Sequence, residues 1–335
     1  MPADVRIGLI GTGAIAQVAH LPILRKLKGV QIAALCDSDA AKARALAERM
    51  GVDAWYTDIE EMLEFAKPDA VVVCTPNHLH EVHTLSALAA GAHVIVERPV
   101  AMQTAGVIRV LKAAEKARRH VLVAMNHRFR SDAQAVHKFL RGGELGDVMT
   151  IRCGWNVFRA AKHQLGWRSR KSESGGGVLM DLGLPMLDLA MWIAGRPEVE
   201  RVSASLHLSG GGQVDELAGV QLYCERGINI YCDVSWRFVG DGERFWLDVQ
   251  AGKGSASISP LRVFKELHGQ PADVTPTGAT SRENLFTQSY RSEWAYFLAG
   301  VRGEVELAPP EDQIGLHKVV EAIYRSAEER HDVKL

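Results

Sequence analysis

The chain has 335 residues, 47% of them hydrophobic and 24% charged, which is typical of a folded globular protein large enough for two domains. Its 39 basic and 40 acidic residues are well mixed and give a formal net charge of -1, which argues against a nucleic-acid-binding protein. No continuous apolar run is long enough to cross a bilayer, and the N-terminus shows no secretory signal, so we expect a cytoplasmic protein with no membrane partner.

The cysteines are scattered along the chain and none has the spacing of metal ligands. We therefore expect reduced, buried thiols and no metal site. A second group, His78, His80 and His83, has the residue types of a metal cluster, but we assign no metal to it. The cysteines are Cys36, Cys74, Cys153, Cys224 and Cys232.

Short apolar runs alternate with helical patterns in the first part of the chain. Repeated strand–helix–strand units predict a doubly wound parallel sheet with helices on both faces and right-handed crossovers, which we assign to residues 1–122. The predicted strands are Arg6–Ile10, Gln31–Cys36, Ala70–Cys74, His93–Glu97 and Val121–Met125, with helices that include Ala40–Met50 and His80–Ala90.

The pattern changes after about residue 120. Partial alternation and tight turns predict a large, mostly antiparallel open sheet in an α/β domain of residues 123–335. The predicted strands are Val148–Phe158, Val199–Leu208, Ala218–Glu225, Ile228–Phe238, Phe245–Ala251 and Ser255–Ser259, and the helices are Asp132–Leu140, Val178–Ala194, Ser289–Val301 and Glu311–Arg330.

A glycine-rich turn follows the first predicted strand. Gly11 permits the tight turn, Gly13 lets the backbone approach a pyrophosphate, and the small Ala16 allows close packing of the helix on the strand. The backbone N–H groups and the helix dipole then face an anion. Because the motif follows a strand and opens a helix, it predicts a dinucleotide site of the Rossmann type that includes Gly11, Thr12, Gly13, Ala14 and Ile15.

Asp37 follows the second predicted strand at about the distance expected for an acid that binds the adenosine ribose. A carboxylate there accepts hydrogen bonds from a ribose 2′-hydroxyl and repels a 2′-phosphate. Since no arginine follows it, we predict NAD in preference to NADP. The alternative is that Asp37 caps the next helix.

Several ordered motifs give the chain a resemblance to the glucose–fructose oxidoreductase, inositol dehydrogenase and rhizopine catabolism (Gfo/Idh/MocA) family. The resemblance covers nearly the whole length. It is carried by Thr75-Pro76-Asn77-His78-Leu79-His80, Glu97-Arg98-Pro99-Val100-Ala101, Asn126-His127-Arg128-Phe129, Gly166-Trp167-Arg168, Gly175-Gly176-Gly177-Val178-Leu179-Met180-Asp181-Leu182-Gly183 and the closing Ser326-Ala327-Glu328-Glu329.

The resemblance implies a Rossmann domain, a second domain with an open sheet that serves oligomer contacts, and NAD(P)-linked hydride transfer on sugars, inositols or related polyols. It also implies a cis bond before Pro99. The cofactor contacts that it implies beyond the glycine loop and Asp37 are Thr75, Pro76, Asn77, His80, Glu97, Arg98 and Asn126.

The chain departs from the family at two catalytic positions. The family's usual lysine is replaced by Arg98 and its usual histidine by Pro185, while the aspartate is retained as Asp181. Arginine stays protonated and cannot act as a general base near neutral pH, but it can stabilise an alkoxide or neutralise phosphate. Proline has no ionisable group and fits best in the first turn of a helix.

Three residues are candidates for the missing acid or base. Asp181 is the first, with an N-cap of the Val178–Ala194 helix as the alternative. His163 is the second, because a histidine titrates near neutral pH, and its alternative is an exposed loop residue. His127 is the third, since it follows the last strand of the first domain, where open α/β sheets bind ligands.

Aromatic and cationic side chains of the second domain suit the recognition of a sugar ring. The alternative for the tryptophans is ordinary packing. We predict substrate contacts from Arg128, Trp155, Trp167, Arg168 and Asp181, with Arg98, Asp181 and His163 as the catalytic set.

We therefore expect an NAD-dependent oxidoreductase of a sugar, cyclitol or polyol with a non-standard acid/base set. Two hypotheses stay open beside it: an NAD-dependent glycosidase that oxidises its substrate transiently, and an NAD-binding sensor without catalysis. We also expect a homodimer or homotetramer, because apolar residues of the second domain, such as Leu222, Ile228, Ile230 and Val234, suggest a sheet that is apolar on both faces.

Overall fold

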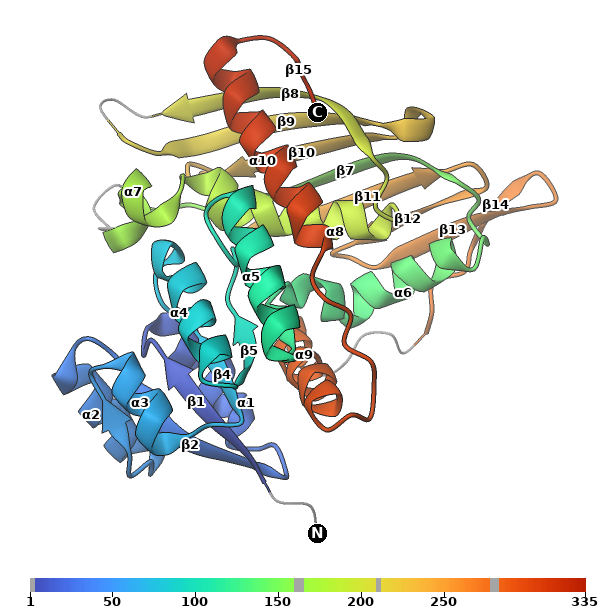
Figure 1. Cartoon of the computed structure of the whole chain (residues 1–335). Coiled ribbons are helices and arrows are strands. Elements are labelled where there is room, and N and C mark those ends of the chain that lie inside the picture. Colours follow the sequence, from blue (N-terminus) through green and yellow to red (C-terminus); the bar gives the residue numbers. More distant parts are fainter. Residues whose placement is uncertain (1–3, 160–165, 209–211, 278–282) are drawn as a thin grey trace. The chain divides into compact units, whose positions relative to one another are not determined.

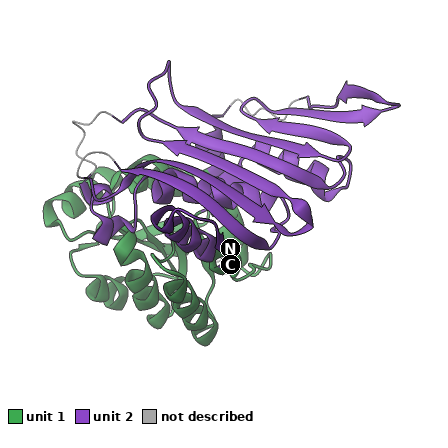
Figure 2. Ribbon diagram, turned by 90° about the horizontal axis from the view of Figure 1, so that it is seen from above, with its two compact units in different colours: residues 1–124, 290–314 green, residues 125–289, 315–335 purple. Residues whose placement is uncertain are grey.

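The computed structural model of the protein describes residues 4–159, 166–208, 212–277 and 283–335. The chain forms two compact units, one of residues 1–124 and 290–314 and the other of residues 125–289 and 315–335, shown in green and purple in Figure 2. The predicted boundary instead assigned residues 123–335 to one domain. Residues 290–314 join the first unit because Trp294 and Phe297 are buried in the same apolar core as Leu9 and Leu35.

The first unit contains a six-stranded sheet in the order β3-β2-β1-β4-β5-β6, and every pair of neighbours is parallel. This confirms the predicted doubly wound sheet. Figure 1 shows its helices. The elements are β1 (Val5–Ile10), the π-helical η1 (Ala16–His20), α1 (Leu21–Leu24), β2 (Val30–Cys36), α2 (Ala40–Met50), β3 (Trp55–Tyr56), α3 (Ile59–Ala66), β4 (Ala70–Val73), α4 (Asn77–Ala89), β5 (His93–Val96), α5 (Thr104–Ala117), β6 (Val121–Val123) and most of α9 (Leu285–Val301).

The second unit contains a nine-stranded sheet in the order β14-β13-β12-β11-β7-β10-β9-β8-β15. Only the pair of β7 and β10 is parallel, which confirms the mostly antiparallel sheet. The strands are β7 (Val148–Asn156), β8 (Val199–Leu208), β9 (Asp215–Cys224), β10 (Asn229–Ser235), β11 (Arg244–Ala251), β12 (Gly254–Ile258), β13 (Arg262–Leu267), β14 (Gln270–Asp273) and β15 (Val333–Lys334).

The helices of the second unit are η2 (Asn126–Phe129), α6 (Ser131–Arg141), η3 (Gly166–Ser169), α7 (Lys171–Ser174), the π-helical η4 (Leu179–Gly183), α8 (Leu184–Ile193), η5 (Glu225–Gly227) and nearly all of α10 (Asp312–Glu329). The stretch Lys171–Ile193 is long and apolar enough to cross a membrane, but 89% of its apolar window is buried inside the protein. The part of it that forms η4 and α8 is therefore interpreted as a core helical segment of this unit.

The two faces of the large sheet differ in polarity. Leu222, Ile230 and Val234 are fully buried, and Ile228 before β10 is buried too, so the expectation of apolar side chains on both faces is wrong. Alternate positions such as Tyr231 are exposed instead. They line a shallow hollow of about 530 Å³ together with residues that include Arg152, Gln221, Asp233 and Trp246.

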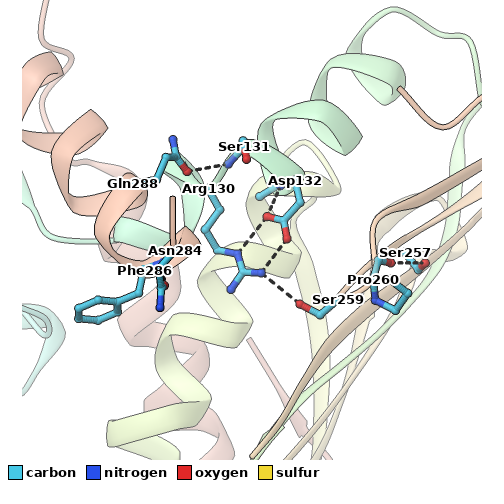
Figure 3. A network of polar contacts seen from close by, with 10 residues as sticks. Arg130, Ser131, Asp132, Ser257, Ser259, Pro260, Asn284, Phe286 and Gln288 are labelled. Atoms are coloured by element: carbon cyan, nitrogen blue, oxygen red, sulfur yellow. Dashed lines mark hydrogen bonds and ion pairs between the residues drawn. The ribbon is translucent and has the colours of Figure 1, made fainter. Parts of the chain in front are cut away.

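A polar network links α6 to the sheet of the same unit (Figure 3). Arg130 pairs with Asp132 through Nε and Nη2, at 3.0 and 2.7 Å, and donates to Ser259 Oγ at 3.1 Å. The N–H of Ser131 donates to Gln288 Oε1 at 3.1 Å. These bonds fix the segment that follows β6, which carries Asn126, His127 and Arg128.

Candidate active site

The glycine loop between β1 and η1 has the geometry of a phosphate cradle. Gly11 has φ of 92°, and a Cβ on it would lie 2.8 Å from the carbonyl of Cys74, so only glycine fits. A Cβ on Gly13 would meet no heavy atom within 4 Å. Since the helix begins directly after Gly13, the open space lies where its N–H groups and dipole favour a pyrophosphate, and the residues present fit a dinucleotide.

The carboxylate of Asp37, at the end of β2, is tied to this loop. Its Oδ2 accepts hydrogen bonds from the N–H and hydroxyl of Thr12 at 2.8 and 2.7 Å, and its Oδ1 accepts one from the N–H of Asp39 at 3.0 Å. Helix α2 is capped by Asp39, which accepts from the N–H groups of Ala41 and Lys42. The alternative that Asp37 caps this helix is therefore wrong.

Glu97, at the end of β5, belongs to a buried network that sequence analysis missed. Trp294 Nε1 donates to His20 Nδ1 at 3.0 Å, so we assign the proton of His20 to Nε2, which donates to Glu97 Oε1 at 2.9 Å. Tyr290 donates to the same oxygen at 3.2 Å. Burial acts to raise the pKa of Glu97, but the His20 hydrogen bond and the charge of Arg98 outweigh it, so this pKa is lowered.

His80 organises the two backbone segments on either side of Glu97. Its Nδ1 lies 2.7 Å from the carbonyl oxygen of Pro99 and its Nε2 lies 2.6 Å from that of Thr75. Burial lowers the pKa of His80. A neutral imidazole has a single N–H, so His80 donates a hydrogen bond to the backbone of one of these two predicted cofactor segments. The peptide bond between Arg98 and Pro99 is cis, which confirms that expectation.

Further predicted cofactor residues lie at the start of helix α4. Pro76 precedes α4, and Asn77 begins it and is buried. His83 places Nδ1 3.0 Å from the hydroxyl of Thr75. Within the described ranges, no three histidine, cysteine, aspartate or glutamate side chains are arranged to hold a metal ion.

In the second unit, the glycine run before η4 allows a close approach of strand β9. Asp215 accepts hydrogen bonds from the N–H groups of Gly177 and Leu179, both at 2.8 Å, and from the hydroxyl of Tyr324 at 3.0 Å. A Cβ on Gly177 would lie 1.9 Å from the Asp215 carbonyl oxygen, and one on Gly176 would lie 1.8 Å from the Tyr324 hydroxyl. Asp215 therefore caps the helix, and the glycines make room for it.

Asp181 lies within η4 and does not cap it, so the N-cap alternative for this residue is wrong. Its Oδ2 accepts hydrogen bonds from Arg159 Nη2 at 2.7 Å and Trp236 Nε1 at 3.1 Å. Its Oδ1 lies 3.6 Å from Arg168 Nε. Pro185 lies in the first turn of α8, which follows directly on the π-helical η4.

Four of the predicted residues lie in a packed part of the same unit. Asn126 Nδ2 donates to Ser289 Oγ at 3.0 Å. Arg128 donates two hydrogen bonds to Asp188, from Nε to Oδ2 at 2.7 Å and from Nη2 to Oδ1, and these bonds join η2 to α8. His127 packs against Trp155, with ring centroids 5.3 Å apart. A substrate contact of Arg128 or Trp155 stays a prediction.

The structure thus brings together Asp181, Arg168 and two residues that the sequence analysis did not select, Arg159 and Trp236. Arg159 lies seven positions before the family-like segment Gly166-Trp167-Arg168, and it has no motif of its own. His163, the third predicted catalytic residue, lies outside the described residues.

The comparisons with known proteins agree with this architecture. Residues 5–125 match the family described as "Oxidoreductase family, NAD-binding Rossmann fold", and residues 133–257 match the GFO/IDH/MocA C-terminal domain. The chain is 29% identical to D-glucoside 3-dehydrogenase of Escherichia coli (strain K12), covering 99% of this chain and 98% of that protein.

Two further similarities cover almost the whole chain. The chain is 32% identical to 1,5-anhydro-D-fructose reductase of Ensifer adhaerens, and the match covers 97% of this chain and 89% of that protein. It superposes on the crystal structure of an aldose-aldose oxidoreductase from Caulobacter crescentus, complexed with glycerol, with a TM-score of 0.83 and 26% identity, over 99% of this chain and 100% of that one.

The parallel sheet, the glycine loop and the family match define a dinucleotide-dependent oxidoreductase with an NAD-binding Rossmann domain. The chain belongs to the GFO/IDH/MocA family of NAD(P)-dependent oxidoreductases.

Proposed function

We propose that the protein interconverts a hydroxyl and a carbonyl group of a sugar or polyol with NAD, and that Arg98 and Asp181 replace the usual acid/base set. The names of the relatives support the substrate class, since they include a glucoside dehydrogenase and an anhydrofructose reductase. Asp37 supports NAD over NADP, because its charge repels a 2′-phosphate.

The residues that would hold the cofactor are those of the glycine loop, Asp37, and the segments of Thr75–Asn77 and Glu97–Pro99. Bound NAD supplies the hydride acceptor for a secondary alcohol, and the overall oxidation gives a ketone, NADH and one released proton. Arg98 stabilises the negative charge that develops on the substrate oxygen, because a guanidinium stays cationic. Asp181 accepts the hydroxyl proton in the oxidation and returns it in the reduction.

The observation that carries this proposal is the placement of Asp181. Its backbone helix is capped by Asp215, so the retention of Asp181 is not explained by helix capping. A carboxylate held by hydrogen bonds from Arg159 and Trp236 has a fixed orientation, as an acid/base group requires.

The test follows nicotinamide absorbance with NAD and a panel of sugars, inositols and sugar acids, and with NADH and keto-sugars in reverse. We expect turnover by the wild type, and a fall in kcat of about 100-fold or more in Asp181→Asn, because a general acid/base contributes about 10²- to 10⁴-fold. The amide keeps the size of the side chain, so Tm reports whether the fold is intact.

Asp248→Asn is the matched control, since Asp248 is exposed on strand β11 of the same unit. It should leave kcat unchanged. Turnover that survives in Asp181→Asn would remove the acid/base role from Asp181 but keep the oxidoreductase. NAD binding without turnover on the whole panel would reject the oxidoreductase and favour the sensor.

We also propose that the protein is a cytoplasmic homodimer or homotetramer. The burial of all five cysteines as free thiols is compatible with a reducing compartment. The exposed aromatic and arginine side chains around Tyr231 and Trp246 support contacts between copies on the open face of the sheet. Sedimentation velocity of the wild type and of Tyr231→Asp tests the assembly.

A further inference from the structure

The first unit has a cavity of about 400 Å³ between η1, α1 and the end of α2. Its lining contains none of the residues assigned above to the cofactor, the substrate or catalysis. The volume lies in the range of sites for small organic molecules, about 300 to 1,000 Å³. We call it the basic cavity, and the residues that line it include Gln17, Leu21, Arg25, Lys26, Arg49 and Met50.

The basic cavity carries positive charge. Three cations line it, Arg25, Lys26 and Arg49, and no acidic side chain does so among the residues that the structure describes. Arg25 and Lys26 are exposed and form no side-chain hydrogen bond or ion pair within the described ranges. Arg49 donates from Nη2 to the neutral amide oxygen of Gln17 at 2.6 Å. The lining therefore presents an uncompensated positive charge to a ligand.

Apolar side chains form another part of the lining. Leu21 is buried in the apolar core of the first unit, and Met50 packs against the same core. Together with Pro22 they give the cavity a hydrophobic surface next to the cations. A small inorganic ion would leave this surface in water, whereas the body of a larger organic anion would cover it.

Hydrogen bonds join the basic cavity to the glycine loop. Gln17 accepts from Arg49 and donates from Nε2 to the carbonyl oxygen of Thr12 at 2.8 Å. This carbonyl belongs to the same planar peptide group as the N–H of Gly13, which lies in the predicted pyrophosphate cradle. A ligand that draws Arg49 away from Gln17 thus removes the group that orients the Gln17 amide, and loosens the support of this peptide.

We propose that the basic cavity binds a small organic phosphate, with its phosphate on Arg25, Lys26 and Arg49, and that the bound anion weakens NAD binding through Gln17. A phosphate monoester has a charge of about -1.5 to -2 at pH 7 and three acceptor oxygens, which suit three cations better than a carboxylate does. By linkage, NAD weakens the binding of the phosphate by the same factor. The site is separate from the proposed oxidoreductase chemistry and does not depend on it.

Isothermal titration calorimetry tests the site with two organic phosphates, AMP and D-glucose 6-phosphate, on the protein without added NAD. Adenosine, D-glucose and inorganic phosphate are the control ligands. We expect one of the organic phosphates to bind with a Kd below about 1 mM. Its dephosphorylated form and inorganic phosphate should each bind at least about fivefold more weakly, because each lacks one half of the contacts. The tighter ligand shows whether a nucleotide or a sugar phosphate is preferred.

Substitutions in the lining should weaken this binding. For Arg25→Gln and for Arg49→Gln we expect a rise in Kd of about 10-fold, the lower end for a hydrogen bond to a charged group. Arg25→Lys should retain part of the affinity, since the charge stays but the planar fork is lost. Arg44→Gln is the matched control, because Arg44 is exposed on the same helix, α2, and pairs with Glu48 at 2.8 Å. It should bind as the wild type does.

Titration of NAD at rising concentrations of the tighter organic phosphate tests the link to the glycine loop. We expect the Kd of NAD to rise about fivefold and then to level off, because both ligands bind at the same time. Gln17→Met should remove most of this rise, since it cannot relay the position of Arg49 to Thr12. The Tm of each variant reports whether the fold is intact.

The outcomes decide each part of the inference. A Kd above about 1 mM for both organic phosphates, or equal binding by Arg25→Gln and the wild type, overturns the site. A Kd of NAD that rises without levelling off places the phosphate on the cofactor site and also overturns it. Binding with no effect on NAD overturns the link and keeps the site. All of these measurements are made without turnover, so failure of the proposed oxidoreductase activity is a distinct result.

Discussion

The proposed preference for NAD rests on one side chain, Asp37. Its two oxygens accept three hydrogen bonds from Thr12 and Asp39, so the carboxylate has a fixed position beside the glycine loop. A fixed negative charge at the ribose side discriminates against a 2′-phosphate through Coulomb repulsion, whereas it accepts hydrogen bonds from a 2′-hydroxyl.

Replacing Asp37 with asparagine should relax the choice of cofactor. The amide keeps an acceptor oxygen but removes the charge, so we expect the ratio of kcat/KM for NADP to that for NAD to rise by about 10-fold, which corresponds to about 1.4 kcal/mol. Steady-state kinetics with both cofactors measures this ratio. Asp58→Asn, at the cap of α3, is the matched control and should not change it. A wild type that uses NADP as well as NAD would contradict the assignment.

The helix that carries Asp181 depends on a strand far away in the sequence. Asp215 of β9 caps the helix, and Gly176 and Gly177 allow the backbone and the Tyr324 hydroxyl to come close. The position of the candidate acid/base is thus set by the packing of a helix end on a sheet. This contact explains why residues 176 and 177 of the family-like segment are glycines, because a Cβ at either position would overlap Tyr324 or Asp215.

Gly177→Ala should destabilise the fold, because its methyl group would overlap the backbone of Asp215. We expect a loss of about 2 to 4 kcal/mol from overpacking and a weakened cap. Chemical denaturation measures the free energy of unfolding. Gly219→Ala is the control, since a Cβ there meets no heavy atom within 4 Å. Equal stability of the two variants would show that the helix end can move away from Asp215.

At the scale of the whole molecule, stability depends on pH through histidines that are buried or half-buried in the fold. Burial lowers the pKa of His80 and His137, and lowers the pKa of His83 and of His93 to about 4. The unfolded chain binds protons on histidines below about pH 6.5. Between pH 4 and 6.5 the unfolded state therefore holds more protons than the folded one, and stability rises with pH.

His93 offers the clearest test of this dependence. Its Nδ1 accepts a hydrogen bond from the N–H of His120 at 3.0 Å, which an imidazolium cannot do. In His93→Asn an amide oxygen accepts that bond at any pH, so the fall in Tm between pH 7 and 5 should shrink by about 2 °C. His207→Asn, an exposed histidine in β8, should show the wild-type slope. An unchanged slope in His93→Asn would contradict the lowered pKa.

Features encoded by adjacent residues were predictable. The parallel sheet, the antiparallel sheet and the glycine loop follow from apolar periodicity and from glycines directly after a strand. The strands β13 and β14 were missed because their residues are mostly exposed and lack an apolar alternation. The return of residues 290–314 to the first unit was missed because helical periodicity does not specify which sheet a helix covers.

By itself, the sequence determined the order of most elements and the glycine-rich dinucleotide loop, and it gave the expectation that Arg98, Asp181 and Pro185 stand at the family's catalytic positions. Only the tertiary structure decided the partners of these residues. His20 meets Trp294, 274 positions away, and Asp181 meets Arg159 and Trp236. The physical reason is that local propensity acts between neighbours in the chain, whereas hydrogen bonds and ion pairs of buried side chains form only where packing of the whole chain brings them together.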